Sequence, residues 1–160
     1  HATDPPNPRL FYDPTGPHRM TVRVRRAFEF EAPAERVWEF ISDPGKRAGA
    51  ISVVRDYDVD GTDATWKIDL QLPLVDRTAT VETEDIEREE PRYVKFVGRS
   101  SVMRVTGEHR IEDTETGCRL HNEFVVDGRL PGVERFFKKR LDAELDNLET
   151  ALRRDLELPA

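Results

Sequence analysis

The chain has 160 residues, of which 37% are hydrophobic and 36% are charged, and it carries a formal net charge of -7. A chain of this length fits one domain with a buried core, and its acidity argues against a nucleic-acid partner, because phosphate binding needs clustered Lys and Arg. No apolar run approaches the roughly 18 residues that a membrane-spanning helix needs, so we expect no integral membrane segment.

The first 19 residues differ from the rest of the chain. They hold five of the eleven prolines and almost no periodic apolar pattern. Such a segment cannot bury enough surface to offset its ordering entropy. We therefore expect a flexible Pro-rich extension over residues 1–19 and a single domain over residues 20–158. The alternative is that residues 10–12 (LFY) pack into a groove of this domain.

The cysteine content and the first residues bear on the cellular compartment. Cys118 is the sole cysteine, which excludes an internal disulfide, and residues 1–19 lack the apolar stretch of a signal peptide. Both features favour a cytoplasmic protein.

A strand and two short helices open the domain. Apolar side chains occupy the even positions of residues 21–30, with Arg26 as the polar exception, which predicts a strand. Pro33 can begin a helix without losing a hydrogen bond, and Pro44 ends it. A second short turn of helix is expected over residues 44–50.

Six strands and a long helix follow. Alternating apolar residues predict strands near residues 53–59, 66–72, 75–86, 94–97, 103–111 and 120–126. In the third of these Ile86 breaks the parity, and a bulge near Glu84 and Asp85 would restore it. One apolar stripe, with spacings of three and four residues, predicts a helix from about Pro131 to Leu156 that lies across the sheet.

This order predicts an α+β helix-grip fold, in which a curved seven-stranded antiparallel sheet wraps around the C-terminal helix. It resembles the START-related, Bet v 1-like superfamily (SRPBCC), and is most similar to its branch of polyketide cyclases/dehydrases and G-type carbon monoxide dehydrogenase subunits. The resemblance covers residues 21–157 and rests on residues 32–38 (APAERVW) with Asp43-Pro44, residues 117–120 (GCRL) and residues 128–132 (GRLPG).

The resemblance implies an internal cavity that binds a small hydrophobic or amphipathic ligand of lipid, polyketide or aromatic type. Members of this superfamily carry lipids, bind plant hormones, cyclise polyketides or assist other enzymes. A carrier or sensor is our first interpretation. The alternatives are a polyketide cyclase/dehydratase-like enzyme and an accessory or interaction protein with a vestigial cavity.

A polar patch is expected on the concave face of the sheet. If a hairpin through residues 113–118 pairs Ile111 with Leu120, then His109 faces Asn122 on the same side. In the family the first strand lies beside the last, so Arg26 could approach the same pair. The three side chains could orient a ligand, and His109 could supply acid/base catalysis near neutral pH. Alternatively, they satisfy one another, or Arg26 pairs with a carboxylate of the final helix.

Apolar residues of the same faces are the candidate cavity wall. Gly107, which would face Phe124, leaves room over the sheet or marks a bend in the strand. The remaining candidates are equally compatible with an ordinary core. The candidate ligand-binding residues, besides the polar three, are Tyr57, Trp66, Met103, Val105, Gly107, Phe124, Phe137 and Leu141.

Other chemistry finds little support in the sequence. The remaining histidines have no partners at metal-ligand spacing, so neither a metal nor another cofactor is expected. Cys118 lies at a predicted turn without a neighbouring base, and the glycines form no phosphate-binding pattern. The expected partner is a small apolar ligand, and the sequence leaves open whether the protein is a monomer or a weak dimer.

Overall fold

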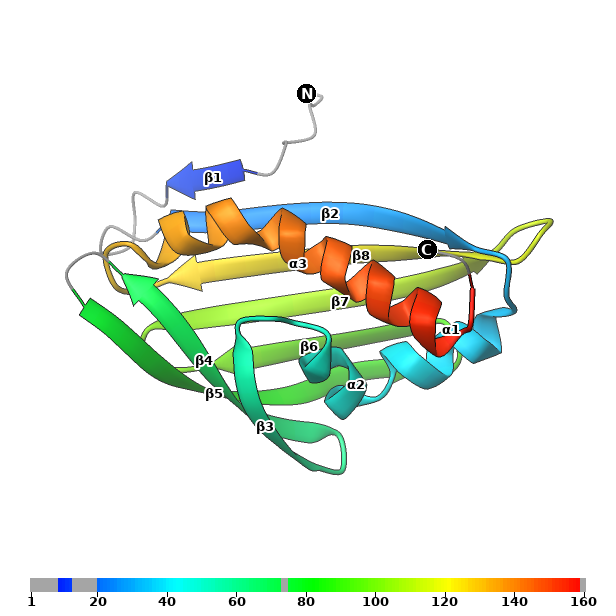
Figure 1. Ribbon diagram of the computed structural model, residues 1–160, viewed down its shortest axis with the longest axis horizontal. Helices are drawn as coiled ribbons and strands as arrows, with labels where there is room; N and C mark the ends of the chain where they lie inside the picture. The colour runs from blue at the N-terminus through cyan, green and yellow to red at the C-terminus, as the bar shows by residue number, and fades with distance from the viewer. Residues whose placement is uncertain (1–8, 13–19, 73–74, 159–160) are drawn as a thin grey trace.

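The computed structural model describes residues 9–12, 20–72 and 75–158. Figure 1 shows the elements, with α3 lying across the sheet. In chain order they are β1 (Arg9–Tyr12), β2 (Met20–Phe30), α1 (Ala34–Ile41), α2 (Pro44–Gly49), β3 (Val54–Asp60), β4 (Asp63–Leu72), β5 (Val75–Glu89), β6 (Tyr93–Arg99), β7 (Met103–Asp113), β8 (Cys118–Gly128) and α3 (Val133–Asp155).

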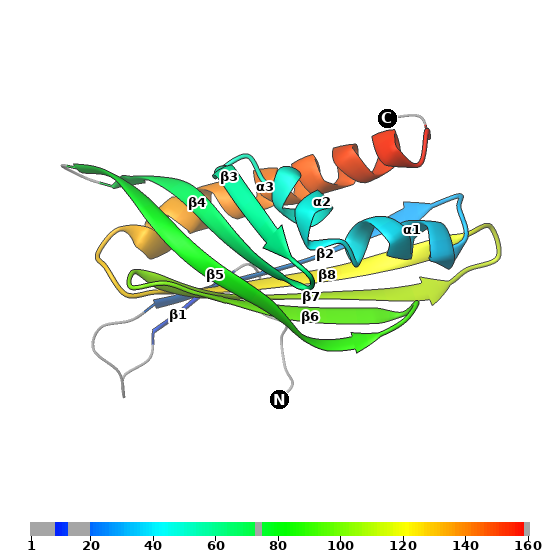
Figure 2. The same cartoon turned by 90° about the horizontal axis from the view of Figure 1, so that it is seen from below.

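The strands form one antiparallel sheet in the order β1-β2-β8-β7-β6-β5-β4-β3. All three helices lie on its concave side, as the view in Figure 2 shows. Strands β2 to β8 are the seven predicted from the sequence, and with α1, α2 and α3 they confirm the helix-grip fold.

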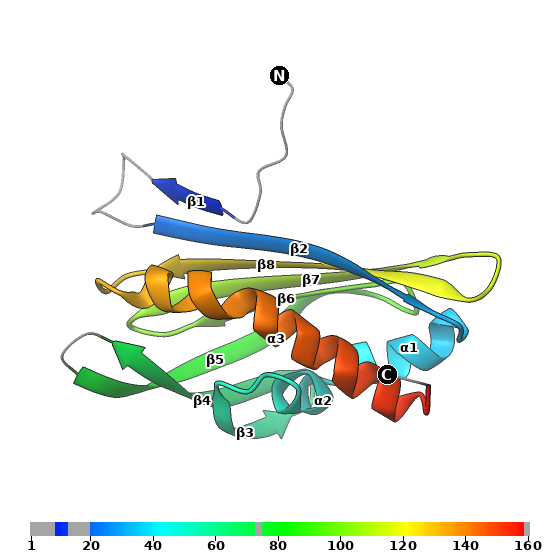
Figure 3. The ribbon, with the colours of Figure 1, turned by 45° about the horizontal axis from the view of Figure 1, so that its top comes forward.

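Strand β1 is an addition to the predicted sheet. Its residues pair with Met20–Arg23 at the start of β2, so the described sheet has eight strands instead of seven. Figure 3 shows β1 at the outer edge of β2. The expected flexibility of residues 1–19 otherwise concerns positions outside the described residues.

The Asp43-Pro44 dipeptide separates α1 from α2, as the sequence predicts. The carboxylate of Asp43 accepts hydrogen bonds from the backbone N–H groups of Gly45 at 2.8 Å and Lys46 at 3.2 Å. Pro44 fits the first helical position because its missing N–H is not needed there. These local signals place Arg47 in the next turn, where its side chain is buried.

Strand β5 contains the predicted irregularity, one position further along than expected. Its register against β6 shifts between Asp85 and Glu87, so that Ile86 is the extra residue. The bulge does not turn Ile86 inward, because this side chain is 48% exposed. The carboxylate of Asp85, by contrast, is buried beside Arg47.

The core lies between the concave face of the sheet and α3. Alternate side chains of β7 and β8 are buried, which matches the period of two residues in their sequences. Helix α3 begins after Gly132, whose positive φ of 96° suits glycine. The leucines of its predicted stripe are buried against the strands. No helix in the described ranges is long and apolar enough to span a membrane.

Strand β3 lies at the opposite edge of the sheet from β1. After Val54 every residue of β3 is exposed. This edge contributes little to the core, which explains why only part of its predicted apolar row is buried.

Candidate functional site

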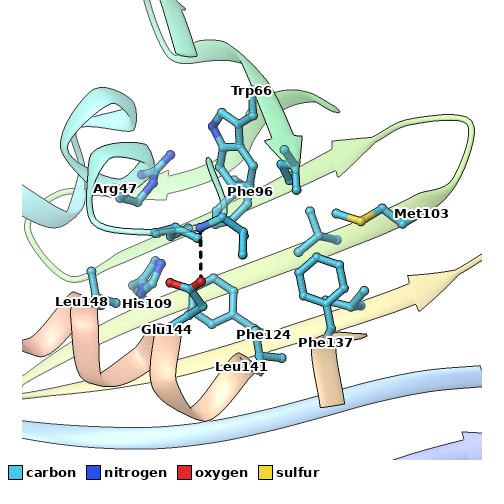
Figure 4. Close-up of a pocket in the computed structure, with 15 residues that line it drawn as sticks. Arg47, Trp66, Phe96, Met103, His109, Phe124, Phe137, Leu141, Glu144 and Leu148 are labelled. Carbon is cyan, nitrogen blue, oxygen red and sulfur yellow. Dashed lines mark hydrogen bonds between the residues drawn. The ribbon is translucent and has the colours of Figure 1, made fainter. Parts of the chain in front are cut away.

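A small, partly enclosed cavity lies between the concave face of the sheet, α3 and the segment that joins α2 to β3. Its volume is about 40 Å³, whereas sites for drug-sized ligands have about 300–1,000 Å³. Figure 4 shows the lining residues. They are Arg47, Ile51, Val53, Trp66, Ile68, Phe96, Met103, Val105, His109, Phe124, Val126, Phe137, Leu141, Glu144 and Leu148.

Aromatic rings take up much of the space that the sheet and α3 enclose. Phe96 forms edge-to-face contacts with Trp66 and Phe124, with ring centroids 5.8 and 6.2 Å apart. All three side chains are less than 10% exposed. The cavity is therefore much smaller than the hollow that the fold could enclose.

Most of the predicted apolar wall does line the cavity. Helix α3 supplies two of these residues, and strands β4, β7 and β8 supply the others, with His109 among them. The predicted residues on the wall are Trp66, Met103, Val105, His109, Phe124, Phe137 and Leu141.

Tyr57 and Gly107, two further predicted residues, are not among the lining residues. Tyr57 is 39% exposed, and its hydroxyl lies where a Cβ added at Gly49 of α2 would be only 3.2 Å away. At Gly107 an added Cβ would lie 2.2 Å from Cε2 of Phe96 and 3.0 Å from Cε1 of Phe124. The missing side chain of Gly107 thus makes room for the core aromatics, in a strand that pairs without a bulge.

The predicted polar row forms in the expected register, but its members separate. Arg26 is paired with Asn122, and Asn122 with His109. The guanidinium of Arg26 contacts the carboxylates of Asp146 and, at 3.2 Å, Asp142 on α3. Arg26 therefore takes the alternative predicted for it, a pair with the final helix, and does not line the cavity.

Asn122 lies behind His109 and fixes its ring. Its amide Nδ2 donates to the carbonyl of Arg26 at 3.0 Å and lies 3.4 Å from that of Leu120, so its Oδ1 faces His109. The distance from this oxygen to Nδ1 of His109 is 2.8 Å. Since Oδ1 can only accept, Nδ1 carries the proton and Nε2 keeps its lone pair.

His109 is 1% exposed, and its Nε2 has no hydrogen-bond partner among the described residues. Burial, together with the charge of Arg47, lowers the pKa of His109 to about 3. The imidazole is consequently neutral near neutral pH and accepts hydrogen bonds there. A base this weak is poorly matched to proton abstraction, because general bases work best with a pKa near the working pH.

Trp66 supplies a second unpartnered polar atom. Its indole Nε1–H is buried and has no acceptor in the described part of the chain. Buried polar groups of this kind are uncommon, because each unmet group costs about 1–3 kcal/mol. The wall thus offers one free donor and one free acceptor on an apolar surface.

Glu144 fastens α3 to the segment between α2 and β3, and the sequence interpretation missed it. Its carboxylate accepts from the backbone N–H and hydroxyl of Ser52, both at 2.7 Å, and from the N–H of Val53 at 3.3 Å. The Val53 bond is the dashed line in Figure 4. We call these three bonds the Glu144 clasp. A signal existed, because Glu144 follows Leu141 by three residues and precedes Leu148 by four, on the apolar stripe.

Arg47, the other missed polar residue, is buried on the wall. Its guanidinium donates to the carbonyl of Ile41 at 2.8 Å and to the carboxylate of Asp85 at 2.5 Å, and lies 5.2 Å from the ring centroid of Phe96. Burial lowers the pKa of Arg47. No local pattern marks it, because its partner comes from the bulge in β5.

Other catalytic groups are not assembled here. Within the described ranges no cluster of His, Cys, Asp or Glu could hold a metal ion. Cys118 is buried away from the lining residues, and burial raises the pKa of its thiol. The chemistry on offer at this cavity is hydrogen bonding and apolar contact.

The fold and the cavity define a START-like ligand-binding fold. A family model described as "Polyketide cyclase / dehydrase and lipid transport" matches residues 21–153, and the chain belongs to this family. No curated protein matches the sequence.

Solved structures share the fold at low identity. A START superfamily protein from Mycobacterium smegmatis has a TM-score of 0.66 at 15% identity, covering 84% of this chain and 97% of that one. A conserved protein from Geobacillus kaustophilus has a TM-score of 0.65 at 12% identity, covering 85% and 95%. The di-domain ARO/CYC StfQ of the steffimycin biosynthetic pathway has a TM-score of 0.64 at 11% identity, covering 86% of this chain and 51% of that one.

Proposed function

We propose that the protein binds a small hydrophobic or amphipathic molecule in the cavity between the sheet and α3, as a carrier or sensor in the cytoplasm. The proposal depends on one observation: two buried polar atoms without partners, Nε2 of His109 and Nε1 of Trp66, belong to an apolar wall. A few polar groups in an apolar pocket are what orient a ligand. The family description, which names polyketide chemistry and lipid transport, supports the same class.

The volume limits what binds without rearrangement. A cavity of about 40 Å³ offers room for one small ring. A lipid chain or a fused polyketide needs α3 to move away from the segment between α2 and β3. The Glu144 clasp opposes this movement, so Glu144→Ala should speed the uptake of long ligands such as decanoic acid.

Binding is tested by titrating the ¹⁵N-labelled protein with toluene and indole and following the amide resonances. We expect shifts at Val105, Phe124 and Leu141, and none in β3. The variant Val105→Phe, which fills the cavity, should abolish the shifts. Val59→Phe places the same side chain at an exposed position and is the matched control. Binding that survives in Val105→Phe, or no binding by the wild type, would contradict the proposal.

An accessory protein with a vestigial cavity is the second candidate, and the small volume favours it. It predicts that no lipophile copurifies with the protein and that none raises its melting temperature. Native mass spectrometry of freshly purified protein separates the two functions. A cyclase- or dehydratase-like enzyme has weaker support, because His109 with a pKa near 3 is a poor base. If a substrate is found, unchanged turnover by His109→Gln would remove that role.

A further inference from the structure

The polar atoms of the cavity wall differ in what they can still bind. His109 is held between aromatic rings, with centroids 6.4 Å from Phe96 and 5.6 Å from Phe124. Asn122 occupies its Nδ1, so only the lone pair of Nε2 is left. A neutral imidazole in this tautomer accepts a hydrogen bond from a ligand and cannot donate one there.

The two charged groups on the wall are already engaged. Arg47 donates to the carbonyl of Ile41 and to Asp85, so its charge is paired. The carboxylate of Glu144 is held by Ser52 and Val53. An anionic ligand would therefore find no free cation, and it would lie in the same cavity as the Glu144 carboxylate.

These constraints select the chemistry of the ligand. A buried carboxylate without a partner is strongly unfavourable, whereas a hydroxyl loses little if it is hydrogen-bonded. We infer that the cavity prefers an uncharged alcohol or phenol, whose hydroxyl donates a hydrogen bond to Nε2 of His109, over a carboxylate of similar size. The indole N–H of Trp66 is available to an oxygen of the same ligand. This inference rests on the function proposed above and narrows it.

Three single-ring compounds test the inference: phenol, toluene and benzoate. Phenol and toluene have nearly the same shape, and a wholly apolar cavity favours toluene because the phenol hydroxyl would be buried unpaired. In the wild type near neutral pH we expect phenol to bind at least as tightly as toluene, and about tenfold or more tighter than benzoate. Affinities are measured by the same amide titration.

The variant His109→Phe keeps a ring between Phe96 and Phe124 but removes the acceptor. It should still bind toluene, while the ratio of phenol to toluene dissociation constants rises about tenfold. If this variant does not fold, the ¹⁵N resonance of His109 Nε2 in the wild type decides, since it should move upfield with phenol and stay in place with toluene.

The outcomes separate the two proposals. Binding of toluene together with a weaker phenol, a tighter benzoate or a static Nε2 resonance overturns the hydroxyl preference and leaves the binding function intact. Absence of binding by all three compounds overturns the binding function, and the hydroxyl preference with it.

Discussion

Arg26 and Arg47 mark two regions where α-helical and strand residues meet through charge, and the two regions differ in nearly every respect. The Arg26 region, between β2 and α3, was expected from the sequence, and its side chain is 28% exposed beside two exposed aspartates. The Arg47 region, between α2 and the β5 bulge, was not expected, and there Arg47 and Asp85 are 5% and 1% exposed.

The difference shows what a sequence pattern can determine. Strand parity puts Arg26 on the concave face, but the long side chain carries its charge out to the edge. No parity rule puts Arg47 inside, because a helix of six residues and a bulge must meet before its charge is paired. The buried region should consequently contribute far more to stability than the exposed one, and four measurements can break or sharpen this contrast.

The largest effect is expected for Asp85→Ala. This substitution leaves the Arg47 guanidinium buried without its counter-charge, which typically destabilises a protein by about 3–5 kcal/mol. Urea unfolding measures the change in the free energy of unfolding. Asp69→Ala, which removes the partner of exposed Arg55, is the matched control and should cost less than about 1 kcal/mol. Equal values for the two variants would refute the contrast.

Asn122→Leu should have the next largest effect. It leaves Nδ1–H of His109 and the carbonyl of Arg26 without their partners, and an unmet buried group costs about 1–3 kcal/mol. The ring of His109 also loses the contact that sets its tautomer. Wild-type stability together with an unchanged His109 ¹⁵N spectrum would show that Asn122 does not position the imidazole.

The pH dependence of stability reports on His109 itself. Its pKa is lowered from 6.5 to about 3 in the folded protein, so between these values the unfolded chain binds the additional proton. The free energy of unfolding should then fall as the pH drops through this window, by up to about 1.4 kcal/mol per pH unit. Acidic groups add their own slope, which is common to wild type and His109→Gln. The slope in the variant should be smaller, and identical slopes would be the contrary result.

Asp146→Ala, in the Arg26 region, should have the smallest effect. Its carboxylate is 68% exposed, and exposed ion pairs contribute about 0–1 kcal/mol. Asp142 is also available to Arg26. A loss above about 2 kcal/mol in urea unfolding would place this pair on the same footing as Arg47 and Asp85.

The fold could be predicted because its signals are local and periodic. Alternation indicated the strands β2 to β8, the Asp43-Pro44 turn separated the two short helices, and the hairpin after Ile111 set the register that joins His109 to Asn122. Strand β1 escaped because it comes from a proline-rich stretch without alternation, and it depends on pairing with β2.

The site was less accessible from sequence because it depends on how elements dock. Parity placed Trp66, Phe124 and His109 on the correct face, yet it could not show that rings would occupy the space over Gly107. Glu144 was overlooked because its charge interrupts the apolar stripe, although its backbone partners in the segment at Ser52 explain its burial.

Strand β3 gives the molecule one open edge, and its composition bears on how the protein behaves at high concentration. An unpaired strand can add a strand from another molecule and so begin aggregation, which charged side chains on the edge oppose. Residues 54–60 (VRDYDVD) carry three aspartates, all exposed. Two copies approaching along this edge would bring like charges together, so the protein can leave it uncovered and stay dispersed.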